Sequence, residues 1–245
     1  MIGRPHVHHR VTDSTNERAR ALAETGATHG TIVTAREQTA GRGRQGRTWT
    51  AAPGEALLLS AIVRELEPRH SLLPLMAALA VCDAAEAVAP VRCEIKWPND
   101  VWVERRKLSG ILVEARPAAG WAVVGIGLNT GVTRFPDELR ETATSLNLAS
   151  PEDALAPLTT ALERWTSARE SDVLPAWRRR DALRGHSVRW DGGEGTARGI
   201  DDAGSLLVET TTGEIALGAG EVHLLGSSAG AQVERRRAER GTSNS

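Results

Sequence analysis

Four β-rich runs joined by tight turns occupy the middle of the chain, and their spacing most constrains the fold. Residues 92–97 and 101–104 flank the turn Pro98-Asn99-Asp100. Residues 108–115 and 121–128 are joined by a four-residue turn that contains proline and glycine. Connections this short favour hairpins. The sequence therefore predicts a hairpin-rich central sheet instead of strictly alternating βα units.

Helices and further strands are predicted on both sides of this region. Ser14 can cap a helix over residues 15–25, which Gly26 ends. Apolar residues at helical spacing predict a second helix over residues 71–89, and Ser150-Pro151 is a typical start for a third that continues to about residue 168. A fourth is expected over residues 173–183, and strands over 31–36 and 56–63. The predicted class is α+β, with a mixed, largely antiparallel central sheet flanked by helices.

The pattern of the sequence after Gly185 differs from that of the residues before it. Short apolar runs alternate with turns at residues 191–193, 202–204 and 212–213, which predicts a small β-barrel. Residues 227–245 show no periodicity and predict a disordered tail. The expected organisation is a main domain over residues 1–185, a small barrel over 186–226 and the tail.

Charge and cysteine content exclude several classes of protein. The chain carries 30 Lys+Arg against 31 Asp+Glu, a formal charge of -1, which argues against a general nucleic-acid binder, and the tail from residue 226 adds only +2. Two cysteines, Cys82 and Cys93, form neither a disulfide framework nor a zinc site and suit the reducing cytosol. The N-terminus resembles no signal peptide, and the apolar run over residues 72–81 is too short to span a bilayer. We expect a cytoplasmic protein without a membrane partner. His6, His8 and His9 could bind a metal, but no carboxylate accompanies them, so we expect surface histidines without a metal.

The richest chemistry lies in Gly41-Arg42-Gly43-Arg44-Gln45-Gly46-Arg47, followed by Thr48-Trp49. Three glycines let the backbone turn its N–H groups towards an anion, and three arginines supply permanently charged planar donors for phosphate or carboxylate. The segment predicts an anion-binding loop. The alternative is a solvated turn with surface arginines.

The same residues also fit the dinucleotide-binding pattern G-x-G-x-x-G. That pattern requires a helix to open directly at the loop, with the pyrophosphate at its N-terminus. Thr48, Trp49 and Thr50 are poor helix formers, and Pro53-Gly54 follow soon after. The sequence therefore argues against a dinucleotide site.

A second group of candidate residues surrounds the two lysines of the chain, Lys96 and Lys107. Every other basic residue is arginine, so lysine at these two points suggests that a small, mobile ammonium matters there. Lys107 opens a predicted strand in which Gly110 permits close approach of a ligand. The alternative is a solvated lysine at a strand end. Asn129, which ends the run from Gly125, is suited to contact a nucleobase or to anchor a turn.

Together these segments resemble the bacterial biotin protein ligases. The resemblance covers about residues 10–225, and Gln45 departs from it where many relatives have another arginine. Only 13 residues precede Ser14, so the resemblance implies a monofunctional ligase without the N-terminal DNA-binding domain of many relatives. The segments that carry it are Ser14-Thr15-Asn16, Gln38 and residues 41–49, 96–100, 107–114, 125–129 and 195–201.

The resemblance implies a class II synthetase-like biotin/lipoate ligase fold with an SH3-like C-terminal barrel. It implies two reactions: biotin attacks ATP, which enters with Mg²⁺, to give biotinyl-5′-AMP and pyrophosphate, and a lysine of a biotin carboxyl carrier domain of an acyl-CoA carboxylase then takes the biotinyl group. Because both partners of the first reaction are anions, cations must neutralise their repulsion. Two alternatives remain: a lipoate or octanoate ligase or transferase of the same fold, and a non-catalytic biotin or adenylate sensor.

The resemblance also implies roles for individual residues, with no resident metal ligand among them. The catalytic residues would be Lys107, Arg44 and Asp100. The alternative for Asp100 is a hydrogen bond within its turn, and for Ser14 a helix cap. Biotin would contact Ser14, Thr15, Asn16, Gln38, Gly41, Arg42, Arg44, Lys107 and Gly110. The nucleotide would contact Arg42, Gly43, Arg44, Arg47, Trp49, Asn99, Lys107 and Asn129.

Overall fold

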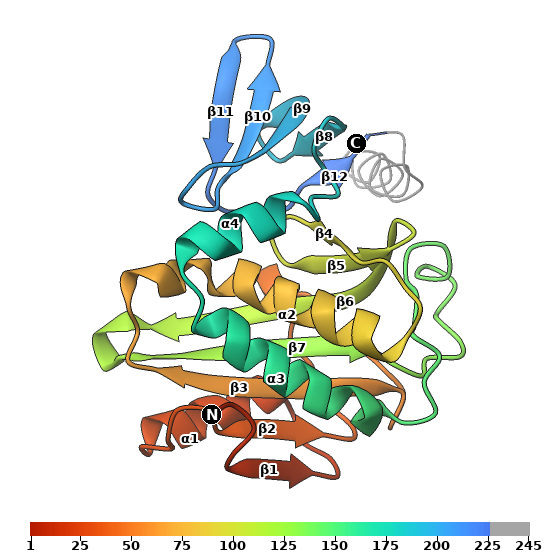
Figure 1. Cartoon of the computed structure of the whole chain (residues 1–245). Helices are drawn as coiled ribbons and strands as arrows, with labels where there is room; N and C mark the ends of the chain where they lie inside the picture. The colour runs from red at the N-terminus through yellow and green to blue at the C-terminus, as the bar shows by residue number, and fades with distance from the viewer. Residues whose placement is uncertain (226–245) are drawn as a thin grey trace, which may run out of the picture.

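The computed structural model describes residues 1–225, which form two β-sheets and four α-helices (Figure 1). The tail predicted over residues 227–245 lies outside the described residues. The larger sheet has the order β1-β2-β3-β7-β6-β5-β4, and its first pair is parallel while the others are antiparallel. The predicted α+β class with a mixed, largely antiparallel sheet is confirmed. The strands are β1 (His6–His9), β2 (Ile32–Ala35), β3 (Ala56–Arg64), β4 (Glu94–Lys96), β5 (Asp100–Val103), β6 (Arg106–Arg116) and β7 (Trp121–Asn129).

Helices cover the two faces of this sheet unequally. On one face α2 (Leu73–Val88) and α3 (Leu155–Thr166) pack against the main core, which includes Leu57 and Leu59 of β3 (Figure 1). On the other face α1 (Thr15–Glu24) packs Ala19 and Ala23 against one end of the sheet. No helix of residues 1–225 covers the rest of this second face, which leaves room there for a pocket.

The helix α2 is apolar because it lies in the core. With the preceding 3-10 turn it forms a helical stretch, Pro68–Val88, that is long and apolar enough to cross a membrane by length and composition. This stretch is longer than the apolar run read from the sequence. However, 67% of its most apolar window is buried inside the protein, and Met76 and Leu79 are almost fully enclosed. Packing against α3 and the sheet therefore accounts for its composition.

Two predicted helices differ from the structure at their ends. The helix expected from Ser150 begins with a 3-10 turn, Pro151–Ala154, before α3. The helix expected over residues 173–183 is wrong in its bounds, since α4 covers Glu170–Arg178. The chain leaves the helix because its next residues pair with the edge strand β4: Ile95 N–H donates to Arg180 O at 2.7 Å, and Ala182 N–H donates to Ile95 O at 3.0 Å. Sheet pairing outweighs local helix propensity here.

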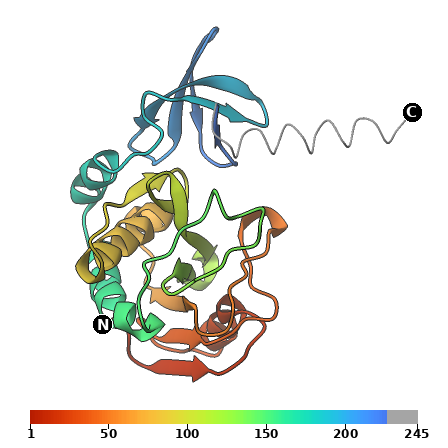
Figure 2. The same cartoon turned by 90° about the vertical axis from the view of Figure 1, so that its right-hand side faces the viewer.

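The smaller sheet contains the short strands predicted after Gly185, in the order β11-β10-β9-β8-β12. It lies beside the β4–β5 end of the large sheet (Figure 2). Hydrogen bonds hold it there: Trp97 Nε1 donates to Gly204 O at 2.9 Å, and Arg178 Nη2 donates to Ile200 O at 3.0 Å, among others. The strands are β8 (Ser187–Trp190), β9 (Gly193–Ile200), β10 (Leu206–Thr210), β11 (Gly213–Leu217) and β12 (His223–Leu224).

Replacing Arg180 with alanine is expected to destabilise the fold by about 2 kcal/mol, because charge-assisted hydrogen bonds would be lost. Arg180 donates to Glu86 Oε1 at 2.7 Å, to Glu86 Oε2 at 2.8 Å and to Cys93 O at 3.1 Å. These bonds join the segment after α4 to α2 and its following loop. Urea unfolding at pH 7 measures the loss, and Arg179→Ala, at an exposed neighbour, is the control.

The destabilisation should also depend on pH. The hydrogen bonds from Arg180 hold the pKa of Glu86 below its ordinary value of 4.5. A carboxylate with a depressed pKa contributes stability above the unfolded-state pKa and loses it as the pH falls through the folded-state pKa. The difference between wild type and Arg180→Ala should therefore shrink below about pH 4.5. Equal effects of the Arg179 and Arg180 substitutions at pH 7 would contradict this account.

Candidate active site

A pocket of about 670 Å³ opens on the face of the large sheet that carries α1. Its floor contains one row of directly paired residues: Lys96 pairs with Asp100, Asp100 with Gly110, Gly110 with Gly127, and Gly127 with Leu58. At about 4.8 Å between neighbouring strands, this row is roughly 19 Å long. The walls come from the loop after residue 41, from a segment over residues 132–143 and from Glu221 and His223 beside the small sheet.

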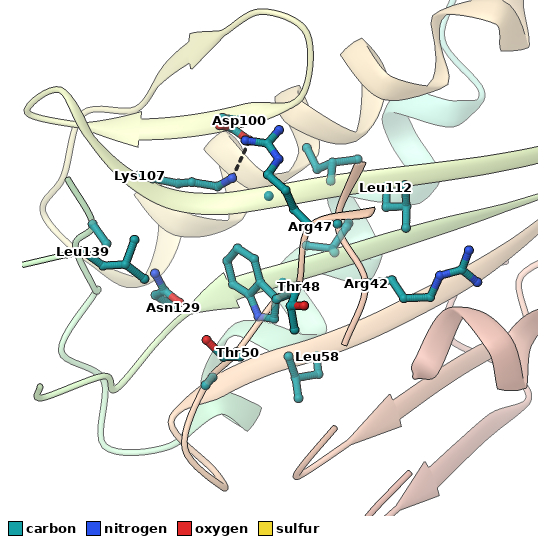
Figure 3. A pocket seen from close by; sticks show the side chains of 18 of the residues that line it. Arg42, Arg47, Thr48, Thr50, Leu58, Asp100, Lys107, Leu112, Asn129 and Leu139 are labelled. Atoms are coloured by element: carbon teal, nitrogen blue, oxygen red, sulfur yellow. Dashed lines mark ion pairs between the residues drawn. The ribbon is translucent and has the colours of Figure 1, made fainter. Parts of the chain in front are cut away.

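Lys107 faces the pocket because of a β-bulge. In the pairing of β5 with β6, Val101 lies opposite Ser109 whereas Trp102 lies opposite Lys107, so Leu108 is an extra residue. A bulge of this kind redirects the side chains before it. Lys107 Nζ lies 2.8 Å from Asp100 Oδ1 and 5.8 Å from the centre of the Trp49 ring. Figure 3 shows Lys107 and Asp100 meeting above the sheet. An ammonium and a carboxylate are thus held together in the middle of the floor.

Two glycines of β7 allow side chains to lie directly on the sheet. A Cβ at Gly127 would lie 2.3 Å from the Trp49 ring, and one at Gly125 would lie 2.0 Å from Asn16 Oδ1. Any larger residue would therefore displace these groups. The Trp49 indole Nε1 is buried and has no hydrogen-bond partner within the described residues. The glycines thus make room for an aromatic side chain that lies directly on the floor, with its Nε1 2.7 Å from the position of a Cβ at Gly127.

Polar groups at the Leu58 end of the floor form a connected network. Thr15 donates to Gln38 Oε1 from its backbone N at 2.7 Å and from its hydroxyl at 3.0 Å. The buried Ser60 hydroxyl lies 2.8 Å from Thr15 Oγ1 and 2.7 Å from Asn16 Oδ1. Ser14 precedes α1 but makes no side-chain capping bond, so the cap predicted for its hydroxyl is wrong, and Ser14 lines the pocket. The network places defined donors and acceptors beside the apolar side chain of Leu58.

The three loop arginines have different surroundings. Arg42 pairs with Glu17 and, at 3.5 Å, with Glu114, and Figure 3 shows it pointing away from Lys107. Arg47 Nη1 lies 2.5 Å from Glu221 Oε1. Arg44 Nη1 lies 3.4 Å from Asn99 Oδ1, and burial together with the nearby Arg47 lowers the pKa of Arg44. Arg44 forms no ion pair with a carboxylate of the described chain, so its charge is available to an anion.

The loop itself is a compact turn. Gly43 N–H donates to Arg47 O at 2.8 Å, Trp49 N–H donates to Gly41 O at 3.0 Å, and only a three-residue 3-10 turn, Arg44–Gly46, lies between them. No long helix opens at the loop. The structural context that the dinucleotide pattern requires, a helix opening directly at the loop, is therefore not present here.

The structure brings the predicted site residues together. All of them line this pocket except Gly41, which lies behind it, where an added Cβ would be 2.3 Å from Trp49 O. Asn129 lines the pocket while its Nδ2 donates to Thr144 O at 3.0 Å, so it also anchors a turn.

Sequence reasoning missed several pocket residues. Lys96 was conspicuous as one of two lysines but received no role, and burial lowers its pKa. No sequence motif marks Glu221 and His223 as pocket residues, because only the docking of the small sheet brings them to the pocket. Residues 132–143 also carried no recognisable signal in the sequence. They reach the pocket because their backbone pairs with Lys107, whose N–H donates to Thr142 O at 2.7 Å. Within residues 1–225, no group of three His, Cys, Asp or Glu side chains is arranged to hold a metal ion.

Family models match both parts of the chain. Residues 8–130 match the Biotin/lipoate A/B protein ligase family, and residues 193–225 match the Biotin protein ligase C terminal domain. The first match contains the loop, both lysines and Asn129. The second contains Glu221 and His223.

Relatives and solved structures agree with these matches. The chain is 37% identical over 232 residues to the biotin--[acetyl-CoA-carboxylase] ligase of Mycobacterium tuberculosis, covering 86% of this chain and 85% of that protein. It is 35% identical over 233 residues to the bifunctional ligase/repressor BirA of Bacillus subtilis, covering 87% of this chain and 72% of that protein. The biotin protein ligase of Aquifex aeolicus in complex with biotin and ATP has a TM-score of 0.79 and 28% identity, covering 91% of this chain and all of that one. The chain belongs to the biotin/lipoate A/B protein ligase family, and within it to the biotin protein ligases.

Proposed function

We propose that this pocket activates biotin with ATP as biotinyl-5′-AMP and transfers the biotinyl group to a lysine of a biotin carboxyl carrier domain of an acyl-CoA carboxylase. The observation that carries the proposal is the Lys107–Asp100 pair at 2.8 Å, which lies in the same pocket as Arg44 and the polar network around Thr15. The Aquifex aeolicus ligase with a similar fold binds biotin and ATP, and the Leishmania major ligase, at TM-score 0.65 and 25% identity, binds biotinyl-5-AMP.

In the first reaction a carboxylate oxygen of biotin attacks the α-phosphorus of ATP. The bond from that phosphorus to the bridging oxygen breaks, and pyrophosphate leaves with the electron pair. Lys107 and Arg44 offset the repulsion between the two anions and the charge that develops at phosphorus. The polar network around Thr15 and Gln38 orients the ring system of biotin. Gly110 and Gly127, which have no side chains, let the reacting groups approach the floor of the pocket. Alignment of this kind contributes several kcal/mol, up to about 10.

Magnesium would enter with ATP. Mg²⁺ is commonly held by substrate phosphates, water and only one or two protein carboxylates, so a pocket without a three-residue metal cluster among its described residues fits this arrangement. When bound, the ion supplies positive charge at the phosphates. Both cysteines are buried free thiols, and we place the reaction in the reducing cytoplasm.

In the second reaction the neutral amine of the carrier lysine attacks the carbonyl carbon of the adenylate. An amide forms, AMP leaves, and the amine loses a proton. Asp100 supplies the nearest carboxylate to Lys107 and is the candidate to orient or deprotonate the incoming ammonium.

The decisive experiment is ATP–pyrophosphate exchange with biotin and then with lipoate. Exchange with biotin alone, followed by labelling of a carrier domain, is expected. Exchange with lipoate alone would identify a lipoate ligase. Absence of exchange with both substrates would identify a non-catalytic binding protein.

Asp100→Asn is expected to slow biotin transfer by about 10²-fold, because a positioned acid or base typically contributes 10²–10⁴-fold. Adenylate formation should fall less, although the loss of the Lys107 partner predicts some decrease. Single-turnover assays of each reaction measure the two effects. Glu104→Gln, which changes an exposed carboxylate after the same strand, is the control. Equal losses in both reactions would remove Asp100 from the transfer step.

A further inference from the structure

Two basic side chains, Lys96 and His223, line the end of the pocket that lies farthest from Leu58. Lys96 is the last residue of the row, and it lies one strand beyond Asp100. Its ammonium lies 5.4 Å from the centre of the Trp102 ring, and it has no hydrogen-bond or ion-pair partner among the described residues. His223 enters from β12 of the small sheet and lines the same pocket. Asp100 and Glu221 act on this ammonium only from beyond ion-pair distance, and a largely desolvated ammonium without a carboxylate in contact is costly unless an anion binds it.

The other charges facing His223 come from three places. Lys96 lies on β4, Arg47 belongs to the glycine-arginine loop, and Glu221 is two residues away, with Oε1 at 3.7 Å from His223 Nε2. Glu221 is itself paired with Arg47 at 2.5 Å, so its negative charge is largely offset. The charge around His223 is therefore predominantly positive, and the missing partner is an anion.

The position of this end of the pocket identifies the anion. Under the proposed function, the α-phosphate reacts beside Lys107 and Asp100. Lys96 lies about 4.8 Å further along the row, which is the distance between neighbouring strands. The rest of a triphosphate that extends from Lys107 towards the small sheet would reach Lys96 and then His223.

We propose that His223, together with Lys96, binds the β- and γ-phosphates of ATP and the departing pyrophosphate, and that its imidazole takes up a proton when they bind. This inference rests on the proposed function and assigns the leaving-group end of its pocket to the small sheet.

The protonation follows from the surroundings of the imidazole. In the ligand-free protein, burial and the nearby Lys96 hold the pKa of His223 below its ordinary value of 6.5, so the ring is neutral at pH 7. A polyphosphate would favour the charged ring, and an opposite charge within hydrogen-bonding range raises a histidine pKa by about 1–3 units. Because the bound state then holds more protons, affinity for ATP is greatest at low pH and falls as the pH rises through the bound-state pKa.

The test follows the imidazole directly by NMR. The histidine signal of position 223, identified by its absence in His223→Gln or His223→Asn, is titrated in the full chain with biotin. It is then titrated again with added Mg²⁺ and α,β-methylene-ATP, which cannot be cleaved to pyrophosphate. We expect the pKa of His223 to rise by about 1–3 units. AMP, which lacks the β- and γ-phosphates, should leave it nearly unchanged.

Kinetics provides an independent measurement. His223→Gln should raise the KM for pyrophosphate in the exchange reaction about tenfold, as expected for one lost charge-assisted contact. It should leave the KM for biotin unchanged and flatten the pH dependence of the KM for ATP. His186→Gln, at an exposed position outside the pocket, is the matched control.

The outcomes separate the two proposals. A nucleotide analogue that binds without moving the pKa of His223, or an unchanged KM for pyrophosphate in His223→Gln, would overturn this inference and leave the ligase function intact. Failure of the wild-type chain to bind the analogue at all would overturn the proposed function and this inference with it.

Discussion

Lys107→Ala should slow adenylate formation by about 10²–10³-fold, or about 2.7–4 kcal/mol in the activation barrier, which is the usual cost of removing one preorganised group that stabilises developing charge. Lys107 lies in the middle of the pocket floor, 2.8 Å from Asp100, which is where the proposed function brings the carboxylate of biotin and the α-phosphate together. Its removal would also leave Asp100 as an unpaired negative charge facing two anionic substrates. Both effects slow adenylate formation.

The assay is a single-turnover measurement of pyrophosphate release with saturating biotin and ATP. Arg106→Ala is the matched control, because Arg106 is the preceding residue of β6, and it pairs with Glu104 instead of the site. We expect Arg106→Ala to retain wild-type rates. Pyrophosphate release at the wild-type rate in Lys107→Ala would remove this lysine from the mechanism.

Gly127→Ala is expected to lower kcat/KM for ATP by about 10²-fold while the protein remains folded, because a displacement of about 1 Å in a positioned group can cost this much. The new Cβ would lie 2.3 Å from the Trp49 ring, so the ring must move away from the floor. Gly127 lies in a strand and has no positive φ, so the backbone itself accepts alanine. The expected loss therefore comes from the pocket and not from unfolding.

A double-mutant cycle distinguishes this explanation from a general disturbance of β7. If the clash with Trp49 causes the loss, Gly127→Ala should have little further effect in a chain that already carries Trp49→Ala. Thermal unfolding checks that both chains are folded. Additive losses in the double variant would show that Gly127 acts through something other than the tryptophan.

Several features of the fold were predictable because short segments specify them. Turn residues close the hairpins of the central sheet, and helical spacing of apolar residues marks α2. The anion-binding loop was also readable, since alternating glycine and arginine has a direct chemical meaning. Family resemblance joins residues from Ser14 to Asn129 in one predicted site, and all of them except Gly41 line one pocket.

Other features depend on contacts between distant segments. Strict alternation along β6 would direct Lys107 away from the face that carries Gly110, and only the bulge at Leu108 brings it to Asp100. The end of α4 is determined by pairing of residues 180 and 182 with Ile95. His223 and Glu221 reach the pocket because the small sheet docks beside β4 and β5.

The amino-acid sequence by itself determined the hairpins, the main helices, the chemistry of the loop and the family, because each depends on residues close together in the chain or on a recognisable pattern. Tertiary structure alone decided which way Lys107 points, where α4 ends and which charges of the small sheet face the pocket. These features depend on strand register and on docking of distant segments, and the free energies that select them arise only when the two sheets are assembled.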